Sequence, residues 1–364
     1  MSPLRSGAGP VHLSLFPQRE SGVGRAFVLA AGHGTRLRPL SLERPKPAWP
    51  FFDVPVAAWV MGMLSAAGVR RVVLNRHHLG EALQQALEPW IPGGLLVDWS
   101  PEPTLLGTGG ALVPWREAFC GGPFFLVNAD TVQELDLAAL ARTHRARGAL
   151  VTLSVAEAPP GEDASLEVDD SGRIVRLLDA RAPGSPPGRP CAFTGVHLLE
   201  PEILAHLPDP PFCIVADVHR PLVARGAPVH AHLLHRGAFW SDLGTPARYV
   251  SAHVEFMARH GAPGAAPGRC VGEGVHEEAG DGRVIGPAFL GEGCRLGTGA
   301  RVGPGAVLGR DAGVASGARV EWAVVWPGAR TGSVRDAVVS DSGAVLRLGD
   351  TGTERGVLRG GRSR

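Results

Sequence analysis

Short apolar runs alternate with segments of helical periodicity along residues 26–155. The runs predict strands at residues 26–30, 71–75, 95–98, 123–128 and 149–155, and the segments predict helices at residues 55–68, 79–87, 109–119 and 135–147. Strands that alternate with helices indicate a mostly parallel sheet with helices on both faces. Ligands bind at the carboxyl ends of the strands in such sheets, which places residues 31–46, 75–78 and 128–130 on one rim.

Residues 156–260 follow a less regular pattern. It predicts strands at residues 173–178, 192–199 and 229–234, and helices at residues 216–225 and 245–258. These elements continue the same sheet, so we expect residues 26–260 to form one α/β domain with a Rossmann-like, mixed and mostly parallel sheet. Residues 1–25 are rich in Gly, Ser and Pro and are expected to be a disordered tail.

A different period begins at residue 284. Aliphatic residues or tryptophan recur every six residues, and mostly small residues follow four positions later: Val284, Leu290, Leu296, Val302, Leu308, Val314, Val320 and Trp326, then Ala288, Cys294, Ala300, Ala306, Ala312, Ala318 and Val324. A period of six is not helical and is typical of a hexapeptide β-helix. We therefore predict a linker at residues 261–270, a parallel left-handed β-helix at residues 271–348 and a tail at residues 349–364.

Composition narrows the classes of function. The chain has 364 residues, of which 44% are hydrophobic and 20% are charged, so a packed core is expected. The formal net charge is only +1, and this lack of an excess of basic residues argues against a nucleic-acid partner. No run of 18 apolar residues and no signal-peptide pattern occurs, so we expect no membrane partner. Five widely spaced cysteines argue against a disulfide framework and favour a cytoplasmic location.

One residue stands apart in this composition. Of the 36 basic residues, Lys46 is the only lysine and the others are arginine. Lysine is a compact charge on a thin stem, whereas guanidinium is wide and planar, so a retained lysine suggests a site that arginine does not serve. Chance is the alternative explanation, because a single lysine must lie somewhere.

The segment around Lys46 predicts a phosphate-binding loop. The strand predicted at residues 26–30 leads into small residues with glycines at positions 32 and 34, and Arg36 follows. Glycine lets backbone N–H groups approach an anion closely, and the two basic side chains would neutralise the charge of that anion. The pattern is neither a P-loop nor a dinucleotide fingerprint, and a purely structural turn is the alternative.

Five motifs in sequence order resemble those of the sugar-1-phosphate nucleotidyltransferases, also called NDP-sugar pyrophosphorylases. They are LAAGHGTRLRPLS at residues 29–41 with PKP at 45–47, LGTGGAL at 106–112, FLVNAD at 125–130, FTGV at 193–196 and FWSDLGT at 239–245. The resemblance implies transfer of a nucleotidyl group from an NTP to a sugar-1-phosphate, with release of pyrophosphate and with Mg²⁺ as the cofactor.

The resemblance also implies roles for particular residues. Arg36 and Lys46 are implied to be catalytic, and Asp130 and Asp242 are implied to bind Mg²⁺. The residues implied in nucleotide binding are Leu29, Ala30, Ala31, Gly32, Gly34, Thr35, Gly107, Thr108 and Gly109. Those implied in sugar-phosphate binding are Asn128, Thr194 and Gly195.

The chain departs from the family pattern at three places. Ala129 replaces the usual glycine before the metal-binding aspartate, and residues 49–53 are bulkier than in the family. Many members hold the sugar and its phosphate with a Glu–Lys pair, which corresponds to residues 178–181 of this chain. Because no lysine is present there, either Arg181 substitutes for it or the sugar phosphate is held differently.

The motifs leave the substrates open. A β-helix after the motifs resembles mannose-1-phosphate guanylyltransferases, which favours GTP and a mannose- or heptose-type sugar-1-phosphate. The glycine pair after Thr108 resembles N-acetylmuramate-1-phosphate uridylyltransferases, so a uridylyltransferase is an alternative. A second alternative is a non-catalytic regulatory relative that binds sugar nucleotides, although Lys46 and both aspartates are kept. An acyltransferase is disfavoured because residues 284–345 contain no histidine.

The resemblance bears on assembly too. Relatives assemble through their β-helices, so we expect a homo-oligomer formed through this domain. Exposed apolar residues such as Trp322 and Trp326 are expected to promote that contact. A chain that ends near Gly261 is expected to fold as a separate catalytic domain.

Overall fold

The computed structural model describes Phe16 and residues 18–158, 164–261, 268–272, 276–279 and 281–349. The chain divides into two compact units. Unit 1 consists of the residues up to Gly32 and of Ala57–Trp240, and unit 2 consists of His33–Val56 and the residues from Ser241 onward. Most of the predicted N-terminal tail, residues 262–267 of the predicted linker and residues 350–364 of the predicted C-terminal tail lie outside the described residues.

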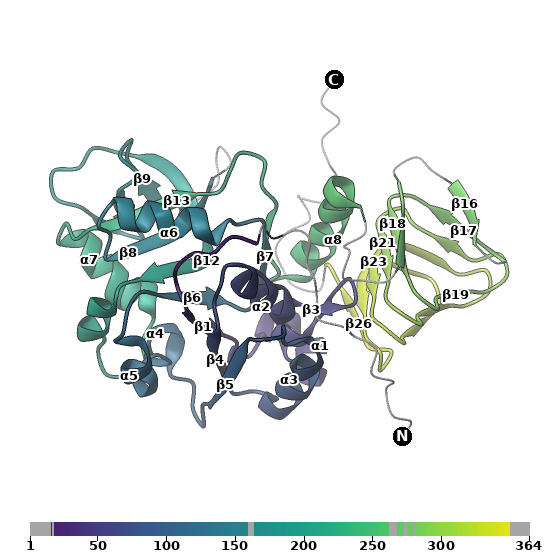
Figure 1. Ribbon diagram of the computed structural model, residues 1–364. Helices are drawn as coiled ribbons and strands as arrows, with labels where there is room; N and C mark the ends of the chain where they lie inside the picture. Colours follow the sequence, from purple (N-terminus) through teal and green to yellow (C-terminus); the bar gives the residue numbers. More distant parts are fainter. Residues whose placement is uncertain are drawn as a thin grey trace. The chain divides into compact units, whose positions relative to one another are not determined.

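A ten-stranded mixed sheet forms the centre of unit 1 (Figure 1). Its strands are β1 (Arg25–Leu29), β4 (Arg71–Arg76), β5 (Leu96–Pro101), β6 (Phe124–Asn128), β8 (Val151–Glu157), β9 (Leu166–Val168), β10 (Ile174–Leu177), β11 (Ala180–Arg181), β12 (Arg189–Leu199) and β13 (Val229–Leu233). The main path runs β11-β10-β9-β12-β6-β1-β4-β5, and β8 pairs with both β12 and β13. Strands β6, β1, β4 and β5 are parallel, whereas β12 is antiparallel to β6. The sheet agrees with the predicted mixed α/β class.

The helices of unit 1 follow the predictions with two exceptions. Helices α2 (Val56–Ala66), α3 (Gly80–Leu87) and α6 (Leu137–Ala146) form where they were expected. The helix predicted at 109–119 is divided into α4 (Gly107–Gly110), the 3₁₀ turn η4 (Val113–Trp115) and α5 (Arg116–Phe119), because glycines and Pro114 interrupt it. The helix predicted at 216–225 is a π-helical segment η6 (Ile214–His219) followed by α7 (Arg220–Ala224). No helix in the described parts of the chain is both long and apolar enough to span a membrane.

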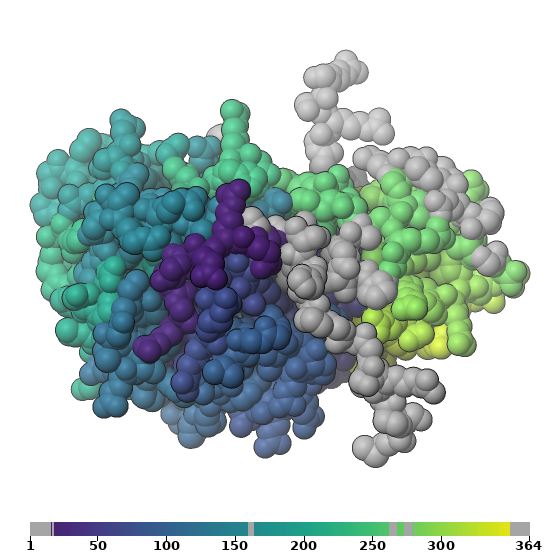
Figure 2. Space-filling view, in the orientation of Figure 1, coloured from purple at the N-terminus to yellow at the C-terminus, as the bar shows by residue number. Residues whose placement is uncertain are grey.

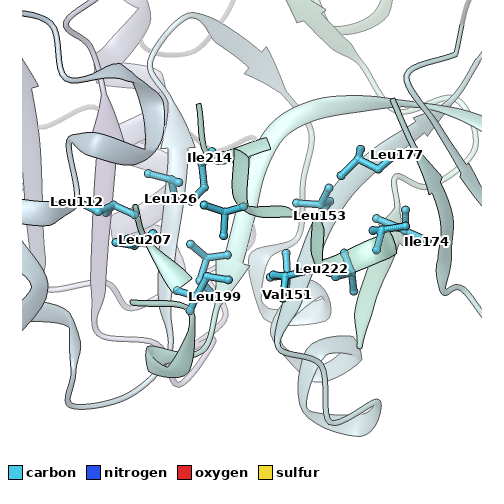
Figure 3. Packing of buried hydrophobic residues seen from close by; sticks show 14 of the residues in the cluster. Leu112, Leu126, Val151, Leu153, Ile174, Leu177, Leu199, Leu207, Ile214 and Leu222 are labelled. Carbon is cyan, nitrogen blue, oxygen red and sulfur yellow. The ribbon is translucent and has the colours of Figure 1, made fainter. Parts of the chain in front are cut away.

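Aliphatic side chains from the sheet and from the segments around it form the core of unit 1. Figure 3 shows Leu126 of β6, Val151 and Leu153 of β8, and Leu222 of α7, which are all at most 2% exposed. Complete burial of such a side chain contributes about 1.5–3 kcal/mol. The core therefore fixes β6 and its neighbours, whose carboxyl ends carry several of the predicted site residues.

Residues 18–24 are part of unit 1, although the sequence places them in a tail. The N–H groups of Arg19 and Ser21 donate to the carbonyls of Ala66 and Ala67, at the C-terminal end of α2. Arg145 of α6 donates to the carbonyl of Ser21 at 2.9 Å. In the space-filling view this purple segment lies against blue and teal residues of the same unit (Figure 2).

Segment 33–56 of unit 2 contains short elements only. They are η1 (Thr35–Leu37), α1 (Leu40–Glu43), η2 (Lys46–Ala48), β2 (Pro50–Phe51) and β3 (Val54–Pro55). Later in the chain, β14 (Trp240–Asp242) precedes helix α8 (Pro246–His260). Helix α8 begins where the Thr245 hydroxyl accepts the Arg248 N–H at 3.2 Å, with Pro246 in the first position that suits proline.

The C-terminal strands of unit 2, which we call the coils, form a nine-stranded and a three-stranded sheet, with α8 beside them (Figure 1). Most of the strands pair in parallel, whereas β15, β16 and β26 are antiparallel to β18, β17 and β25. They are β15 (Gly268–Val271), β16 (His276–Ala279), β17 (Gly282–Ile285), β18 (Ala288–Gly291), β19 (Arg295–Leu296), β20 (Arg301–Val302), β21 (Ala306–Leu308), β22 (Gly313–Val314), β23 (Arg319–Val325), β24 (Arg330–Thr331), β25 (Val334–Val339) and β26 (Val345–Arg347). Val284 pairs with Val302 and Val302 with Val320 in parallel register, so one coil takes three hexapeptides. This pairing is compatible with the predicted β-helix.

The side chains within the coils are those expected from the six-residue period. Val284, Val302 and Leu308 are completely buried, together with the alanines four positions after them, and Val320 is completely buried as well. The expectation of exposed tryptophans is wrong, however. Trp326 is completely buried, because Trp49 packs edge-on against its ring at 5.1 Å and Arg44 covers it at 4.8 Å. Trp322 is half-buried.

Candidate functional site

The first loop and the end of β6 meet at the carboxyl edge of the sheet in unit 1. Leu29 of β1 pairs with Asn128 of β6, and the Leu29 carbonyl accepts the Ala129 N–H at 3.0 Å. The Ala30 N–H donates to Asn75 Oδ1 at 2.6 Å. Three of the predicted site residues are thereby gathered with Asn75, as the parallel-sheet rule predicts for this rim.

A buried hydrogen-bond chain extends from this edge to the second motif. Asn75 Nδ2 donates to Glu102 Oε1 at 2.7 Å, and Glu102 Oε2 accepts the Leu106 N–H at 3.0 Å. Asn75 and Glu102 are 3% and 4% exposed, so these hydrogen bonds are shielded from water. Glu102 was not among the predicted site residues, and the only sequence signal was its position four residues after the strand predicted at residues 95–98.

The conformation of the second motif depends on Phe212. A Cβ at Gly107, where φ is 80°, would collide with the Phe212 carbonyl, and a Cβ at Gly109 would collide with the Phe212 ring. The Phe212 carbonyl accepts the Gly109 N–H at 3.1 Å, and the Thr108 hydroxyl accepts the Ile214 N–H at 3.0 Å. Gly107 and Thr108 are exposed, whereas Gly109 is buried. Close packing of residues 212–214 thus accounts for the glycines.

The third and fourth motifs lie side by side. Gly195 of β12 has a φ of 96°, and a Cβ there would lie 3.1 Å from Thr131 and 3.3 Å from Asn128. Asp130, between these two residues in sequence, is half-buried. Thr194 is completely buried, and its hydroxyl lies 2.6 Å from the Ser154 hydroxyl. Of this group, Asn128 and Asp130 therefore have side chains that are partly open to solvent.

In unit 2 the loop that is predicted to bind phosphate folds back on itself. Gly34 has a φ of 60°, and a Cβ there would lie 3.2 Å from Ser41 Cβ and 3.7 Å from Lys46 Cβ. Lys46 begins η2 and is 9% exposed, whereas Thr35 and Gly32 are exposed. The only lysine thus lies beside a glycine that is in the left-handed region, in a largely buried position.

Arg36 and the fifth motif are close together in unit 2. The Gly244 N–H donates to Asp242 Oδ1 at 2.5 Å. A Cβ at Gly244 would collide with that carboxylate and would lie 3.1 Å from Arg36 Nη2. Arg248 Nη1 is 3.5 Å from Asp242 Oδ2, but both side chains are about 40% exposed, so this pair is weak. A carboxylate and two guanidinium groups therefore lie near Gly244.

These aspartates have the right chemistry for Mg²⁺. Magnesium is usually held by one or two carboxylates, with waters and substrate phosphate oxygens completing the octahedron. Asp130 and Asp242 are both half-buried, so a carboxylate oxygen of each can face a ligand. Within the described residues no cluster of three or more His, Cys, Asp or Glu that could hold a metal ion is found.

The guanidinium of Arg181 is held by other groups of the protein, and these contacts argue against a role in substrate binding. Its guanidinium donates to Glu167 Oε2 at 2.8 Å and to the Pro186 carbonyl at 3.1 Å. Burial raises the pKa of Glu167, but hydrogen bonds from Gly188, Arg181 and Arg176 together lower it to about 2, so it is ionised at neutral pH. These contacts favour the second of the two alternatives, in which other residues hold the sugar phosphate.

The fold and these motifs define a class. A glycine loop follows the first strand of a mostly parallel sheet, and polar residues line the carboxyl edge of that sheet, as in α/β proteins that bind nucleotides. The family model described as "Nucleotidyl transferase" matches residues 25–259. The chain belongs to this family, which confirms the resemblance to sugar-1-phosphate nucleotidyltransferases.

The sequence identity to each of the relatives described next is below 30%. The chain is 29% identical over 282 residues to "Probable mannose-1-phosphate guanylyltransferase 3" of Oryza sativa subsp. japonica, which covers 72% of this chain and 75% of the relative. It is 27% identical to a mannose-1-phosphate guanylyltransferase of Mycobacterium tuberculosis (84% and 80% covered) and 26% identical to a UTP–glucose-1-phosphate uridylyltransferase of Synechocystis (85% and 84% covered). The crystal structure of HddC from Yersinia pseudotuberculosis is similar in fold, with a TM-score of 0.54, 24% identity, and coverage of 64% of this chain and 100% of that chain.

Proposed function

We propose that this protein transfers a nucleotidyl group from GTP to a mannose- or heptose-type sugar-1-phosphate, which releases pyrophosphate and forms an NDP-sugar. The family match supports the reaction. The two guanylyltransferase relatives, one of them matched over 84% of this chain, support the choice of nucleotide. The observation that carries the proposal is the arrangement in unit 2, where Lys46 lies beside Gly34 and where Arg36 and Asp242 lie beside Gly244.

In this nucleotidyl transfer the protein mainly positions the substrates and neutralises their charge. An oxygen of the sugar-1-phosphate attacks the α-phosphorus of the NTP, and the bond to the leaving pyrophosphate breaks. The side chains of Lys46 and Arg36 neutralise phosphate charge, and the backbone N–H groups of residues 31–35 hold the phosphates. Asp130 and Asp242 would hold Mg²⁺, which supplies further charge neutralisation at the phosphate oxygens.

The base and the sugar are assigned to different parts of unit 1. Residues 107–109 are proposed to bind the nucleotide, in a conformation that Phe212 maintains. Asn128 and Gly195, at the adjoining ends of β6 and β12, are proposed to bind the sugar phosphate, with Thr194 holding Gly195 in place from the core.

The C-terminal coils are proposed to be a left-handed parallel β-helix through which copies of the chain associate. The parallel pairing of residues 18 positions apart supports the β-helix. With Trp326 buried, self-association must use other surfaces of the coils. All five cysteines are unpaired, which supports the proposed cytoplasmic location.

A uridylyltransferase is the second candidate. The glycine pair at residues 109–110, after Thr108, favours it, and so does the Synechocystis relative. A site built to pair with one base rejects another by several kcal/mol, so the two candidates differ measurably.

One assay decides between the candidates. The full chain is incubated with Mg²⁺, each NTP in turn and a panel of sugar-1-phosphates, and pyrophosphate release is measured. The guanylyl proposal predicts the highest kcat/KM with GTP and a mannose- or heptose-type substrate. Higher kcat/KM with UTP for every sugar phosphate would replace it with the uridylyl candidate. Sugar-nucleotide binding without any pyrophosphate release would identify a non-catalytic relative.

A further inference from the structure

Segment 33–56 is anchored in the C-terminal coils on both sides of Lys46. The first anchor holds Glu43 and Arg44, and the second holds residues 49–53. Only Pro45 separates Lys46 from the first anchor, and two residues separate it from the second. Pro45 and Pro47 restrict the backbone on either side of Lys46, so movement of either anchor is transmitted to it.

The first anchor is the turn between β25 and β26, residues 340–342, which we call the serine turn. Ser340 Oγ donates to Glu43 Oε2 at 2.9 Å, and Ser342 Oγ donates to Glu43 Oε1 at 2.9 Å. Asp341 between them pairs with Arg44 at 3.1 Å. Ser340 is completely buried, so the Glu43 carboxylate is held on one side by a group that water does not replace.

Trp326 joins the two anchors. Its ring lies 4.8 Å below the Arg44 guanidinium and 5.1 Å from the Trp49 ring, and Trp49 Nε1 donates to the Arg44 carbonyl at 3.0 Å. The backbone N–H of Trp326 donates to the carbonyl of Val339, next to the serine turn. Trp326 and Trp49 are at most 1% exposed, so this contact is rigid and dry.

The second anchor continues along β2 and β3. Phe52 packs edge-on against Phe289 of β18 at 5.0 Å, and its N–H donates to His253 Nε2 of α8 at 3.1 Å. Asp53 Oδ1 accepts the Arg310 N–H at 2.8 Å. Contacts on both sides of Lys46 therefore join segment 33–56 to residues that lie about two hundred to three hundred positions later in the chain.

We propose that Trp326 and the serine turn are positioning residues for the reaction, because they hold Lys46 where it neutralises phosphate charge. The coils are then part of the catalytic apparatus and not only a means of assembly. This inference rests on the proposed function of Lys46. It assigns an indirect role in catalysis to residues of the last two coils.

A double-mutant cycle on the full chain tests this. Trp326→Leu, and separately Ser340→Ala with Ser342→Ala, are made in the wild type and in Lys46→Ala. We expect kcat to fall about ten-fold and about three-fold in the wild-type background, within the range of measured pair couplings. In the Lys46→Ala background the same changes should alter kcat less than two-fold, and KM for both substrates should change less than kcat. Thermal unfolding confirms that each variant is folded in the assay.

The controls separate positioning from general stability. Trp322→Leu, in β23 just before Trp326, and Ser316→Ala, on another turn of the coils, should leave kcat within two-fold of wild type. Ser342→Thr keeps the hydroxyl and should retain activity. Equal losses of kcat in the presence and absence of Lys46, or wild-type kcat in the serine and tryptophan variants, would overturn the positioning role alone. Wild-type activity of Lys46→Ala would overturn the proposed role of Lys46 and, with it, this inference.

Discussion

Asp53 makes the stability of unit 2 depend on pH. Asp53 is 9% exposed, and its Oδ2 is buried with no hydrogen-bond partner among the described atoms. Burial raises the pKa of Asp53 from 3.8 to about 7; the N–H and the charge of Arg310 lower it, and Asp311 raises it. Desolvation is therefore the dominant cause.

The sign follows from proton linkage. The folded chain binds the Asp53 proton more tightly than the unfolded chain does, so folding is favoured where the carboxyl is protonated. This contribution is fully present below pH 3.8, and it is lost as the pH rises through about 7. The pKa difference corresponds to a loss of about 4 kcal/mol. That is a large share of the 5–15 kcal/mol by which domains are usually stable.

Asp53→Asn tests this, because asparagine keeps an oxygen for the Arg310 N–H but does not titrate. Urea unfolding of both proteins is measured from pH 5 to pH 8, and the difference in unfolding free energy is followed so that other titrating groups cancel. The variant should gain about 2–3 kcal/mol relative to wild type over this range. Asp281→Asn, on an exposed corner of the coils, is the matched control and should show no such gain. A difference that stays constant from pH 5 to pH 8 would refute the reasoning.

Three further predictions concern the site and the coils. Asp130→Asn or Asp242→Asn should lower kcat by about two orders of magnitude, because charge at the phosphates is lost while shape is kept; near-normal turnover at limiting Mg²⁺ would contradict the metal assignment. Lys46→Arg should also be damaging in the pyrophosphate assay, since the wide guanidinium does not fit a largely buried lysine position; retained activity would mean that the single lysine is an accident of composition. A chain ending at Gly261 should be inactive and unstable in thermal unfolding, contrary to the expectation from sequence, because two buried aromatic rings of segment 33–56 lose partners worth about 5–10 kcal/mol. A chain ending at Gly349 is the control, and a stable, active product of the shorter truncation would contradict the packing argument.

The elements that the sequence predicts well are those with local signals. Continuous apolar runs place β1, β4, β6 and β8 within a few residues, and the six-residue period predicts the parallel pairing of Val284 with Val302. The rule for parallel sheets predicts that Asn75 and Asn128 lie on one edge. These inferences succeed because they depend on residues close together in sequence, or on a rule that holds for a whole fold class.

Other features depend on contacts that no local pattern encodes. The resemblance implies that Gly107 and Gly109 bind the nucleotide, whereas the packing of Phe212, about a hundred residues later, already requires glycine at both positions. Glu102 is a lone acid in the sequence, and it becomes a link between the first two motifs only when β4 and β5 pair.

Residues 49–53 illustrate the same point for unit 2. This stretch is bulkier than the family pattern, and no local signal in the sequence explains why. In the structure, Trp49 packs against Trp326, Phe52 packs against Phe289, and Asp53 bonds to Arg310. The bulky segment and the coils are complementary surfaces, so a change in one requires a change in the other. The packing of residues 49–53 against the coils therefore explains the departure from the family pattern.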